Sequence, residues 1–562
     1  MARILLLLFF LLWMAGTSDL TPRPPDAIGL DLALFLGTYA MLIGVMRVWS
    51  VRVARRVASV NFGRRLDRFN FVMFLARCFV PAWFAVGIFL LGWGWVVEEK
   101  LGLGWLQSTR LPSVLLGTLP PMLAWMALWW SQYPAERALR EQNLLNQLGE
   151  DLPLHAPPPF RAYFFSNLRL QLLFTVVPVL MMIVVRDAIS VAVTSHLPGH
   201  AQIAASASAD AEDDPMEMVV WVAAAGLVFL VAPEVLRRVL RTQPLQDGPL
   251  RRRLEALCRR SGVRYRQILF WDTDQNMGNA AVMGIIPWMR YILLSDVLIE
   301  TMTDDQIEAV FAHEVGHVVH RHMAWFVVFF AVLFTGMWGV ERAAEATRWF
   351  GANAMVIGSL IISPAAFCVG FGLLSRRFER QADVYAARTI QSVSGDRQTF
   401  VQNVDRIAAG ASMFTCPAGA ITSSNVGLLE GQGFIMGARN APDPASARHG
   451  EPHPGGEEPG PKINNDPSPL NYESPTTGKS FVGPYGAILF GSALHRVAKV
   501  NNIPVAKNEW LHGSIAARMQ YLRDLSTDPD LTGRFDRRMV RIYCGLLFAL
   551  AVSAVWLVSA IR

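Results

Sequence analysis

Apolar segments long enough to cross a lipid bilayer dominate this chain. Eight stretches of about 20 residues each have the length that an α-helix needs to span the hydrocarbon core. Of the 562 residues, 52% are hydrophobic and only 17% are charged, whereas soluble globular proteins carry about 25% charge. We therefore expect a mainly α-helical, polytopic membrane protein with spans near residues 28–49, 71–97, 111–133, 168–186, 218–236, 323–341, 353–374 and 541–561.

The first 18 residues, "MARILLLLFFLLWMAGTS", form a separate segment ahead of these spans. One arginine precedes an apolar run of roughly 13 residues, which is short for a membrane span and typical of a signal peptide. Small residues follow the run, as they do at a cleavage site. A cleaved signal peptide is the first expectation for residues 1–18, and a short uncleaved anchor is the alternative.

The charged residues indicate how the spans are oriented. Residues 47–69 and 237–266 are strongly basic, whereas residues 205–218 are acidic. The net charge of +6 follows from these basic loops beside apolar segments, so we expect no nucleic-acid partner. Because Lys and Arg accumulate in cytoplasmic loops, we expect four segments to lie in the cytoplasm, namely residues 50–70, 134–167, 237–322 and 375–540.

The order of spans and loops divides the rest of the chain into five parts. Residues 19–236 are expected to form a five-span membrane region, and residues 323–374 two further spans. Residues 237–322 and 375–535 would supply the two parts of one cytoplasmic catalytic domain. Residues 536–562 would carry the C-terminal span.

Two compositional features refine this division. Residues 440–478 are rich in Pro, Gly and charge, so they cannot bury a core and we expect a disordered insertion. The five cysteines are scattered along the chain and form no Cys-x-x-Cys pair. We therefore expect neither a disulfide framework nor a cysteine metal site.

A capped helix carries the chemistry of the chain. Thr303 and Gln306 have the spacing of a capping box, and the sequence "HEVGH" follows within the same helical pattern as His313, Glu314 and His317. Residues four apart share one face of a helix, so both imidazoles can reach one ion. Zinc takes imidazole nitrogen as a ligand and keeps one position open for water at a catalytic site. Glu314 is placed to take a proton from that water as general base.

A third ligand is needed, and a later helix offers it. The metzincin class would place a histidine at position 323, where this chain has Met323. The sequence "SRRFERQADVYAAR" instead offers Glu379, with Asp383 one turn further along the same face. We expect one Zn²⁺ per chain with Glu379 as its third ligand, and Asp383 as the carboxylate that holds the free N–H of a ligand histidine.

Two further histidines follow the motif. On a continuous helix His320 shares the face of His313 and His317, so we expect it behind the ligands or along the path to them. His322 would point away from the site, at the membrane boundary.

These motifs resemble a known family. "HEVGH", two intervening spans and "SRRFERQADVYA" are similar to the membrane-embedded zinc peptidases of the CAAX prenyl protease and HtpX heat-shock protease family. Residues 279–300, "NAAVMGIIPWMRYILLSDVLIE", resemble the strand-bearing segment that this family places before its His-Glu-x-x-His helix. Residues 509–522, "EWLHGSIAARMQYL", resemble its Thr-His-Pro-Pro-x-x-x-Arg-Ile motif, with Leu511, Gly513 and Ser514 in place of the threonine and the prolines.

The resemblance implies a fold and further site residues. It implies a gluzincin-like catalytic domain with a small β element, in which substrate backbone adds to an edge at Asn279 and Ala280. It also implies that His512 and Arg518 bind the scissile carbonyl oxygen or nearby substrate backbone, where developing charge needs hydrogen-bond donors.

The expected function is zinc-dependent endopeptidase activity in the lipid bilayer on peptides or membrane proteins. We expect the inner membrane of a bacterial cell, with the catalytic domain in the cytoplasm. A metal transporter and a catalytically inactive membrane scaffold are the alternatives. A transporter would carry its polar residues within the spans, and a scaffold would not need Glu314. The substrate, any role of prenylation and the oligomeric state are left open.

Overall fold

The structure is a computed structural model, and contacts divide the chain into two compact units. The first unit comprises Met1–Gly395 and Ser480–Arg562, and the second Asp396–Lys479. The expected disordered insertion at residues 440–478 lies outside the described residues. The described residues all belong to the first unit and are 2–16, 28–56, 62–101, 110–147, 156–196, 215–275, 277–347, 352–393, 482–501 and 503–561.

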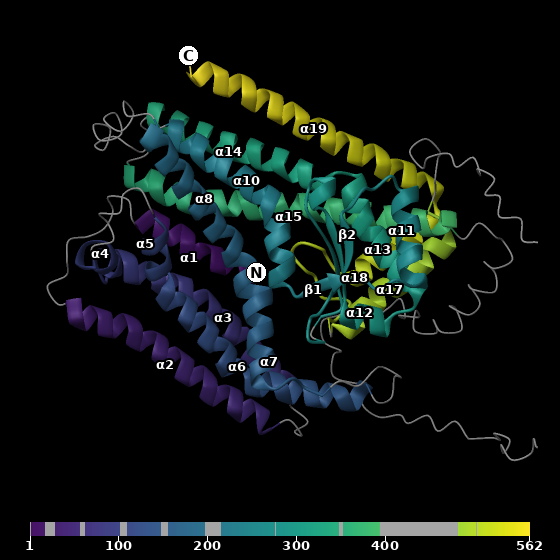
Figure 1. The fold of residues 1–562 in the computed structure, drawn as a ribbon, viewed down its shortest axis with the longest axis horizontal. Helices are drawn as coiled ribbons and strands as arrows, with labels where there is room; N and C mark the ends of the chain where they lie inside the picture. Colours follow the sequence, from purple (N-terminus) through teal and green to yellow (C-terminus); the bar gives the residue numbers. More distant parts are fainter. Residues whose placement is uncertain are drawn as a thin grey trace, which may run out of the picture. The chain divides into compact units, whose positions relative to one another are not determined.

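Helices make up most of the described chain, so the expected mainly α-helical fold is confirmed (Figure 1). The helices are α1 (Ala2–Gly16), α2 (Ile28–Ala54), α3 (Phe62–Phe89), α4 (Trp93–Trp95), α5 (Leu111–Gly117), α6 (Leu119–Gln147), α7 (Phe160–Asn167), α8 (Phe174–His196), α10 (Pro215–Val239), α11 (Pro249–Arg260), α12 (Asp296–Thr301), α13 (Asp304–Val319), α14 (His322–Thr347), α15 (Ala352–Val393), α17 (Pro484–Val500), α18 (Ile515–Thr527) and α19 (Pro529–Ile561). Short π-helical segments lie at Val96–Lys100 and Leu168–Leu173, and a 3₁₀ turn at Pro287–Met289.

Each of the eight expected spans falls on a helix or helix pair of this series. Among the described residues, four helices are long and apolar enough to cross a membrane, or up to six if each bent pair counts as one span. The side chains of α10 and α15, which carry two expected spans, are described only in part. Several apolar helices therefore agree with a polytopic arrangement, and the number eight stays a prediction.

The expected span 71–97 needs a correction at its end. Helix α3 stops at Phe89, and the chain turns through Gly92, whose φ of 71° is in the left-handed region that favours glycine. The short helix α4 then starts a new direction at Trp93.

Aromatic side chains fill the core of the N-terminal membrane region. The largest fully buried side chains there come from α1, α2, α3 and α6, and those of the last three helices include Phe35, Phe84 and Trp125. Helix α1 contributes Phe9 and Trp13 to the same cluster. Helix α1 is thus part of this core.

Trp13 is fixed within that core by two features of the 110–117 segment. Its Nε1 donates a hydrogen bond to Ser113 Oγ at 3.0 Å. Gly117 leaves room for its ring, because a Cβ at that position would lie 2.3 Å from the indole. The burial of Trp13 agrees with the alternative that residues 1–18 are kept as a short anchor.

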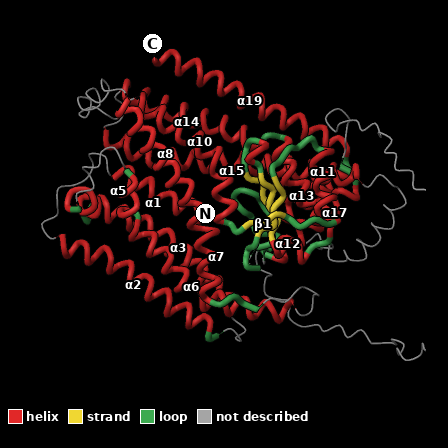
Figure 2. Tube along the Cα trace, in the orientation of Figure 1, coloured by secondary structure: helices red, strands yellow, loops and turns green. Residues whose placement is uncertain are grey.

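A four-stranded sheet confirms the expected small β element (Figure 2). Its strands are ordered β1-β2-β4-β3, with β2 parallel to β4 and the other two pairs antiparallel. Strand β4 is buried along its whole length, as its apolar sequence and inner position require. Strand β3 is an edge strand, and α13 lies next to it. The bounds are β1 Thr242–Pro244, β2 Gln267–Trp271, β3 Ala280–Met283 and β4 Tyr291–Ser295.

Helix α13 packs against α15, α17 and β3. The expected capping box begins it, because the Thr303 hydroxyl accepts from Gln306 N and the Gln306 side chain accepts from Thr303 N, both at 3.3 Å. Glu308 of α13 is 3% exposed and pairs with Arg253 of α11 at 2.7 Å. These contacts fix the helix that carries the His-Glu-x-x-His motif.

Candidate active site

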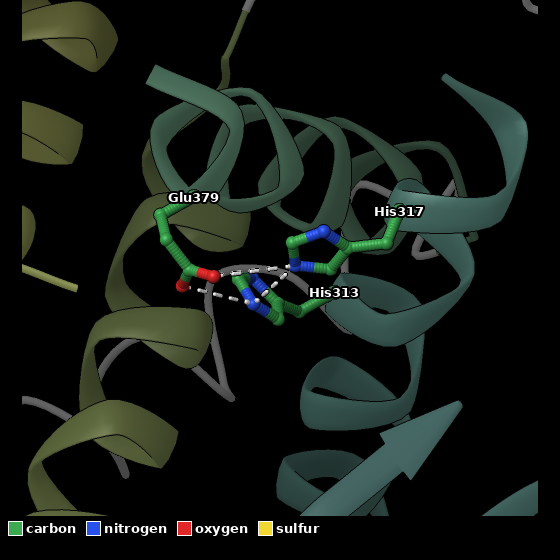
Figure 3. A group of neighbouring side chains, drawn as sticks. All are labelled: His313, His317 and Glu379. Carbon is green, nitrogen blue, oxygen red and sulfur yellow. Dashed lines mark hydrogen bonds and ion pairs between the residues drawn. The ribbon is translucent and has the colours of Figure 1, made fainter. Parts of the chain in front are cut away.

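Three side chains from two helices converge on one point. His313 and His317 of α13 and Glu379 of α15 offer ligand atoms that all lie within 4.8 Å of one another. The two Nε2 atoms are 3.2 Å apart, and each is 3.6 Å from one oxygen of Glu379. Figure 3 shows the carboxylate facing both imidazoles.

The spacing of these atoms fits a zinc ion. Ligand atoms about 2.0–2.2 Å from a tetrahedral zinc are about 3.3–3.6 Å from one another, and two imidazoles with one carboxylate form a ligand set of catalytic zinc sites. The distances of 3.2 to 3.6 Å match that geometry. The structure therefore brings together the three residues that the sequence predicted as ligands.

A glycine allows the two ligand-bearing helices to approach closely. A Cβ at Gly316, within the "HEVGH" motif, would lie 3.0 Å from Tyr385 Cδ1 and 3.2 Å from Ala382 Cα of α15. Both distances are tighter than ordinary van der Waals contact. The absence of a side chain at Gly316 thus brings Glu379 within reach of the histidines.

Asp383 lies behind His313, where the sequence placed it. Its Oδ1 is 3.0 Å from His313 Nδ1, although the approach is not aligned as a hydrogen bond, so we describe the contact as an electrostatic pair. Arg518 of α18 donates two hydrogen bonds to the same carboxylate. Burial acts to raise the pKa of Asp383, but the charge of Arg518 and the contact with His313 outweigh it and hold that pKa below its usual value.

Arg518 makes a contact inside the protein that the sequence did not indicate, and its expected role as a substrate ligand stays a prediction. Its Nε and one terminal nitrogen are committed to Asp383, so much of its charge is neutralised inside the protein. Asp383 does not use the remaining N–H groups of Arg518, and the Arg518 side chain also lines the cavity described below. Its contact with Asp383 gives it a positioning role toward His313 that the sequence did not indicate.

His512 lies against Glu379, the third candidate ligand. Its Nδ1 is 3.0 Å from Glu379 Oε2, and the side chain is about half exposed to the cavity. The hydrogen bond to Glu379 raises the pKa of His512. The structure therefore places His512 at the site, and a contact with substrate stays a prediction.

The loop around His512 explains its departures from Pro-Pro. Gly513 has a φ of 74°, a conformation that proline cannot adopt, and it pairs with Glu509 to close a tight turn. Ser514 caps α18 by accepting a hydrogen bond from Ala517 N at 3.2 Å. The substitutions at both positions thus have a local structural role.

Glu314 lies on the same cavity as the ligands, beside strand β3. Burial raises the pKa of Glu314 to about 7, against the charge of His313 and a hydrogen bond from the backbone of Val282, which lower it. A carboxylate that titrates near neutrality is suited to general-base work.

The two predicted substrate-binding residues, Asn279 and Ala280, differ in the direction of their backbone groups. Both backbone groups of Asn279 form hydrogen bonds with Ser295. The Asn279 N–H donates to Ser295 Oγ at 2.8 Å, and the Asn279 carbonyl accepts from the Ser295 N–H at 3.0 Å. By the alternation of an antiparallel ladder, Ala280 and Val282 turn their backbone groups away from β4. A substrate backbone would therefore meet Ala280 directly, and Asn279 only through its side chain.

His322 is where the sequence interpretation was wrong. We expected it to point away at the membrane boundary, yet it is 1% exposed and its Nδ1 is 2.9 Å from His317 Nδ1. The cause is Arg321, whose φ of 54° interrupts the helix. Helices α13 and α14 therefore meet at 47°, and the angular positions of one continuous helix do not apply beyond residue 320.

His320 does not contact the ligands. Its Nδ1 hydrogen-bonds to the carbonyl of Gly316 at 2.9 Å, and its ring stacks on His322 with centroids 5.6 Å apart. The contact behind a candidate ligand histidine, one of the two expectations for His320, is made by His322 instead. The other expectation, a place along the path to the ligands, stays a prediction.

A cavity of about 1300 Å³ joins the site to the membrane helices. Its lining includes His313, Glu314, His317, Glu379 and His512. It also includes apolar side chains of α8 and α10, namely Phe174, Met182, Val228, Phe229 and Leu236. A substrate in this cavity would meet both the candidate metal ligands and an apolar surface.

Two histidines and a glutamate that could hold a metal ion, with a second glutamate beside them, form the arrangement expected of a metallopeptidase. Residues 244–458 match the sequence profile of Peptidase family M48. This chain therefore carries a peptidase M48 domain, together with several apolar helices of a membrane protein. The matched range includes the three candidate ligands and Glu314, whereas His512 and Arg518 lie beyond it.

Curated relatives of two kinds are similar to this chain. A CAAX prenyl protease 1 homolog of Arabidopsis thaliana is 30% identical over 159 residues, which cover 26% of this chain and 38% of the relative. CAAX prenyl protease 1 of Saccharomyces cerevisiae is 26% identical over 174 residues, with the same two coverages. A protease HtpX homolog of Aeropyrum pernix is 26% identical over 192 residues, 32% of this chain and 59% of the relative.

The similarity is confined to part of each protein. The chain spans less than two fifths of the length of the CAAX prenyl proteases that it matches. Among solved structures, the crystal structure of S. mikatae Ste24p is 16% identical, with a TM-score of 0.35 over 65% of this chain and 89% of that chain.

Proposed function

We propose that this protein is an integral-membrane, zinc-dependent endopeptidase that hydrolyses peptide bonds of peptides or membrane proteins. The observation that carries the proposal is the spacing of His313, His317 and Glu379, whose ligand atoms are 3.2 to 3.6 Å apart on the wall that also holds Glu314. The M48 domain and the protease names of its relatives support the same reaction class.

Each residue of the site has a role in such a reaction. Bound zinc would supply Lewis acidity toward the scissile carbonyl group. Glu314 would take the proton of the attacking water and pass it to the leaving amine. His512 would donate a hydrogen bond to the carbonyl oxygen as negative charge develops on it. Asp383, held by Arg518, would keep His313 in the orientation that presents Nε2.

The edge of β3 would hold the substrate in an extended form. Ala280 and Val282 have backbone groups that the sheet leaves unused on that side. Since Val282 also hydrogen-bonds to Glu314, a strand added beside β3 would pass close to the general base. The apolar wall from α8 and α10 would favour substrates with an apolar segment next to the cleaved bond.

The proposed location is the inner membrane of a bacterial cell with the catalytic domain in the cytoplasm. The basic residues at 47–69 and 237–266 support this orientation through the preference of Lys and Arg for the cytoplasmic side. Reporter fusions after residues 56 and 347 would test it, because the proposal puts the first in the cytoplasm and the second outside.

The proposal is tested by comparing wild type with Glu314→Gln in detergent on a quenched peptide. Glu314→Gln should keep its zinc and lose activity by about 100-fold or more, since a general base contributes at least that factor. Glu255→Gln, on α11 and away from the site, is the matched control. Equal cleavage by wild type and Glu314→Gln would refute the proposal, and a zinc-loaded wild type without activity would favour the scaffold alternative.

The ligand set has its own test. Glu379→Ala should lose zinc when the purified protein is dialysed against a weak chelator, because two histidines alone hold the ion less tightly. Full zinc occupancy in this variant would exclude Glu379 as the third ligand.

A further inference from the structure

A line of hydrogen bonds runs from a ligand histidine to the C-terminal helix. His317 Nδ1 is 2.9 Å from His322 Nδ1, and His322 Nε2 is 3.0 Å from Gln381 Oε1. The hydroxyl of Tyr543 donates to the same Gln381 oxygen. The four residues come from α13, α14, α15 and α19, so the line connects these four helices.

The direction of these bonds follows from the metal site. His317 turns its Nε2 toward Glu379 and His313, so a neutral ring that binds metal through Nε2 carries its proton on Nδ1. His322 must then accept at Nδ1 and carry its own proton on Nε2, which donates to Gln381. Gln381 Oε1 accepts from both His322 and Tyr543, which fixes the orientation of its amide. In this arrangement each of the three hydrogen bonds has one donor and one acceptor.

Packing restricts the line to that arrangement. The ring of His322 lies flat on Phe378, with centroids 4.3 Å apart and an angle of 1° between the planes. The ring of Tyr543 stacks on Trp325 with centroids 4.4 Å apart. His322 is 1% exposed, so water does not compete for its nitrogens.

The two ligand histidines thus have different supports. His313 faces the carboxylate of Asp383, which two hydrogen bonds from Arg518 hold in place. On its Nδ1 side, His317 instead faces the neutral imidazole of His322. An anionic partner makes a ligand imidazole more basic, whereas a neutral partner chiefly fixes its orientation.

We propose that His322, Gln381 and Tyr543 are positioning residues that orient His317 for metal binding and make α19 part of the support of the metal site. The proposal rests on the metal site of the proposed function. Tyr543 lies beyond the family-matched range of 244–458, so α19 adds to this site a contact that the matched domain does not contain.

The test is the dissociation constant for Zn²⁺, measured on the full chain in detergent by competition with a chromogenic chelator. Gln381→Leu removes the acceptor at similar volume and should weaken zinc binding by about tenfold or more, the usual cost of losing a supporting hydrogen bond behind a ligand. His322→Phe should cost at least as much, because it leaves the N–H of His317 unpaired. Tyr543→Phe should cost less, since His322 still bonds to Gln381.

Rescue variants separate positioning from mere packing. Gln381→Glu keeps an acceptor for His322 and should bind zinc at least as tightly as wild type. A purely structural role predicts the opposite order, because a buried charge destabilises more than leucine does. Tyr385→Phe removes a hydroxyl of α15 that bonds to Ser261 outside the line, so this matched control should keep wild-type affinity.

Two outcomes distinguish this inference from the proposed function. If wild type binds zinc and cleaves peptide while Gln381→Leu and His322→Phe keep wild-type affinity, the positioning role is refuted and the peptidase remains. If wild type does not bind zinc, both proposals fall. Should His322→Phe fail to fold, Gln381→Leu and Gln381→Glu decide the matter, and the visible absorption of Co²⁺ in their sites reports the ligand geometry independently of activity.

Discussion

Arg518 and Asp383 are joined by two parallel hydrogen bonds, from Nε to Oδ2 at 2.9 Å and from Nη2 to Oδ1 at 2.6 Å. Both side chains are nearly buried, at 11% and 2% exposed. Asp383 is also 3.0 Å from His313 Nδ1. Helix α18 therefore acts on the candidate metal site through a carboxylate of α15, although 135 positions separate the two residues.

Replacement of Arg518 should lower both stability and zinc affinity. Arg518→Ala leaves a buried carboxylate without its partner, a change that costs about 3–5 kcal/mol in folded proteins. Arg518→Lys keeps the charge and loses the paired geometry, so we expect a smaller loss. Thermal unfolding in detergent and zinc content measure the two effects. Equal stability of Arg518→Ala and wild type would contradict the importance of this pair.

Larger side chains at Gly316 should push the ligand-bearing helices apart. Gly316→Ala places a methyl group 3.0 Å from Tyr385, and Gly316→Leu forces a larger displacement that costs about 1–3 kcal/mol as overpacking. We expect zinc affinity to fall slightly for alanine and strongly for leucine, measured by chelator competition. Gly336→Ala in α14 is the control, because nothing lies within 4 Å of its added Cβ. Wild-type affinity in Gly316→Leu would disprove the close-approach argument.

The Cys258 thiol should be unreactive in the folded protein. Burial raises its pKa to about 12, so at pH 8 its thiolate is about a thousandfold rarer than that of an ordinary cysteine. Alkylation followed by mass spectrometry should label Cys258 only after denaturation. Fast labelling under native conditions would show that α11 does not pack as described.

The Cys258 thiol also makes the free energy of unfolding depend on pH in the alkaline range. A pKa raised in the folded state favours the protonated form there, so its contribution is complete below the ordinary value of 9.0 and is lost as pH rises toward 12. Cys258→Ala should therefore reduce the fall of the unfolding temperature across that window. An unchanged slope would indicate that other groups cause the fall.

Helix α1 should be retained in the mature protein. Phe9 and Trp13 fill part of the core between the N-terminal helices. Removal of residues 1–18 by cleavage would leave that space open. The intact mass of protein purified from membranes should include residues 1–16, and a mass that lacks them would favour the signal peptide. Trp13→Ala should cost about 3–5 kcal/mol, as for other buried aromatic residues. Leu11→Ala, at a position 64% exposed, should cost little.

The sequence predicted the parts of the site that depend on local helix geometry. His313 and His317 share a face because they are four residues apart, and Glu379 and Asp383 repeat that spacing on α15. The apolar segments and the capping box of α13 were also local signals, and both appear in the structure.

The remaining features depend on contacts between distant elements or on a break in a helix. The sequence does not reveal that Arg518 reaches Asp383, because that pairing depends on how α18 packs against α15. The prediction for His322 was wrong because Arg321 adopts a left-handed conformation. The helix is interrupted there, so the spacing of a continuous helix does not apply to His322. A charged residue with positive φ leaves little trace in sequence.

Helix α15 connects an expected membrane span directly to the candidate metal site. Its 42 residues run without interruption from Ala352 to Val393, a rod of about 63 Å. The expected span at 353–374 occupies one end, and Glu379 lies a little more than one turn beyond it. A helix that tilts to match a thinner or thicker bilayer carries that carboxylate with it, while the histidines stay on α13. We therefore expect the proposed peptidase activity to depend on lipid chain length, which detergent assays hold constant and vesicles of defined thickness would vary.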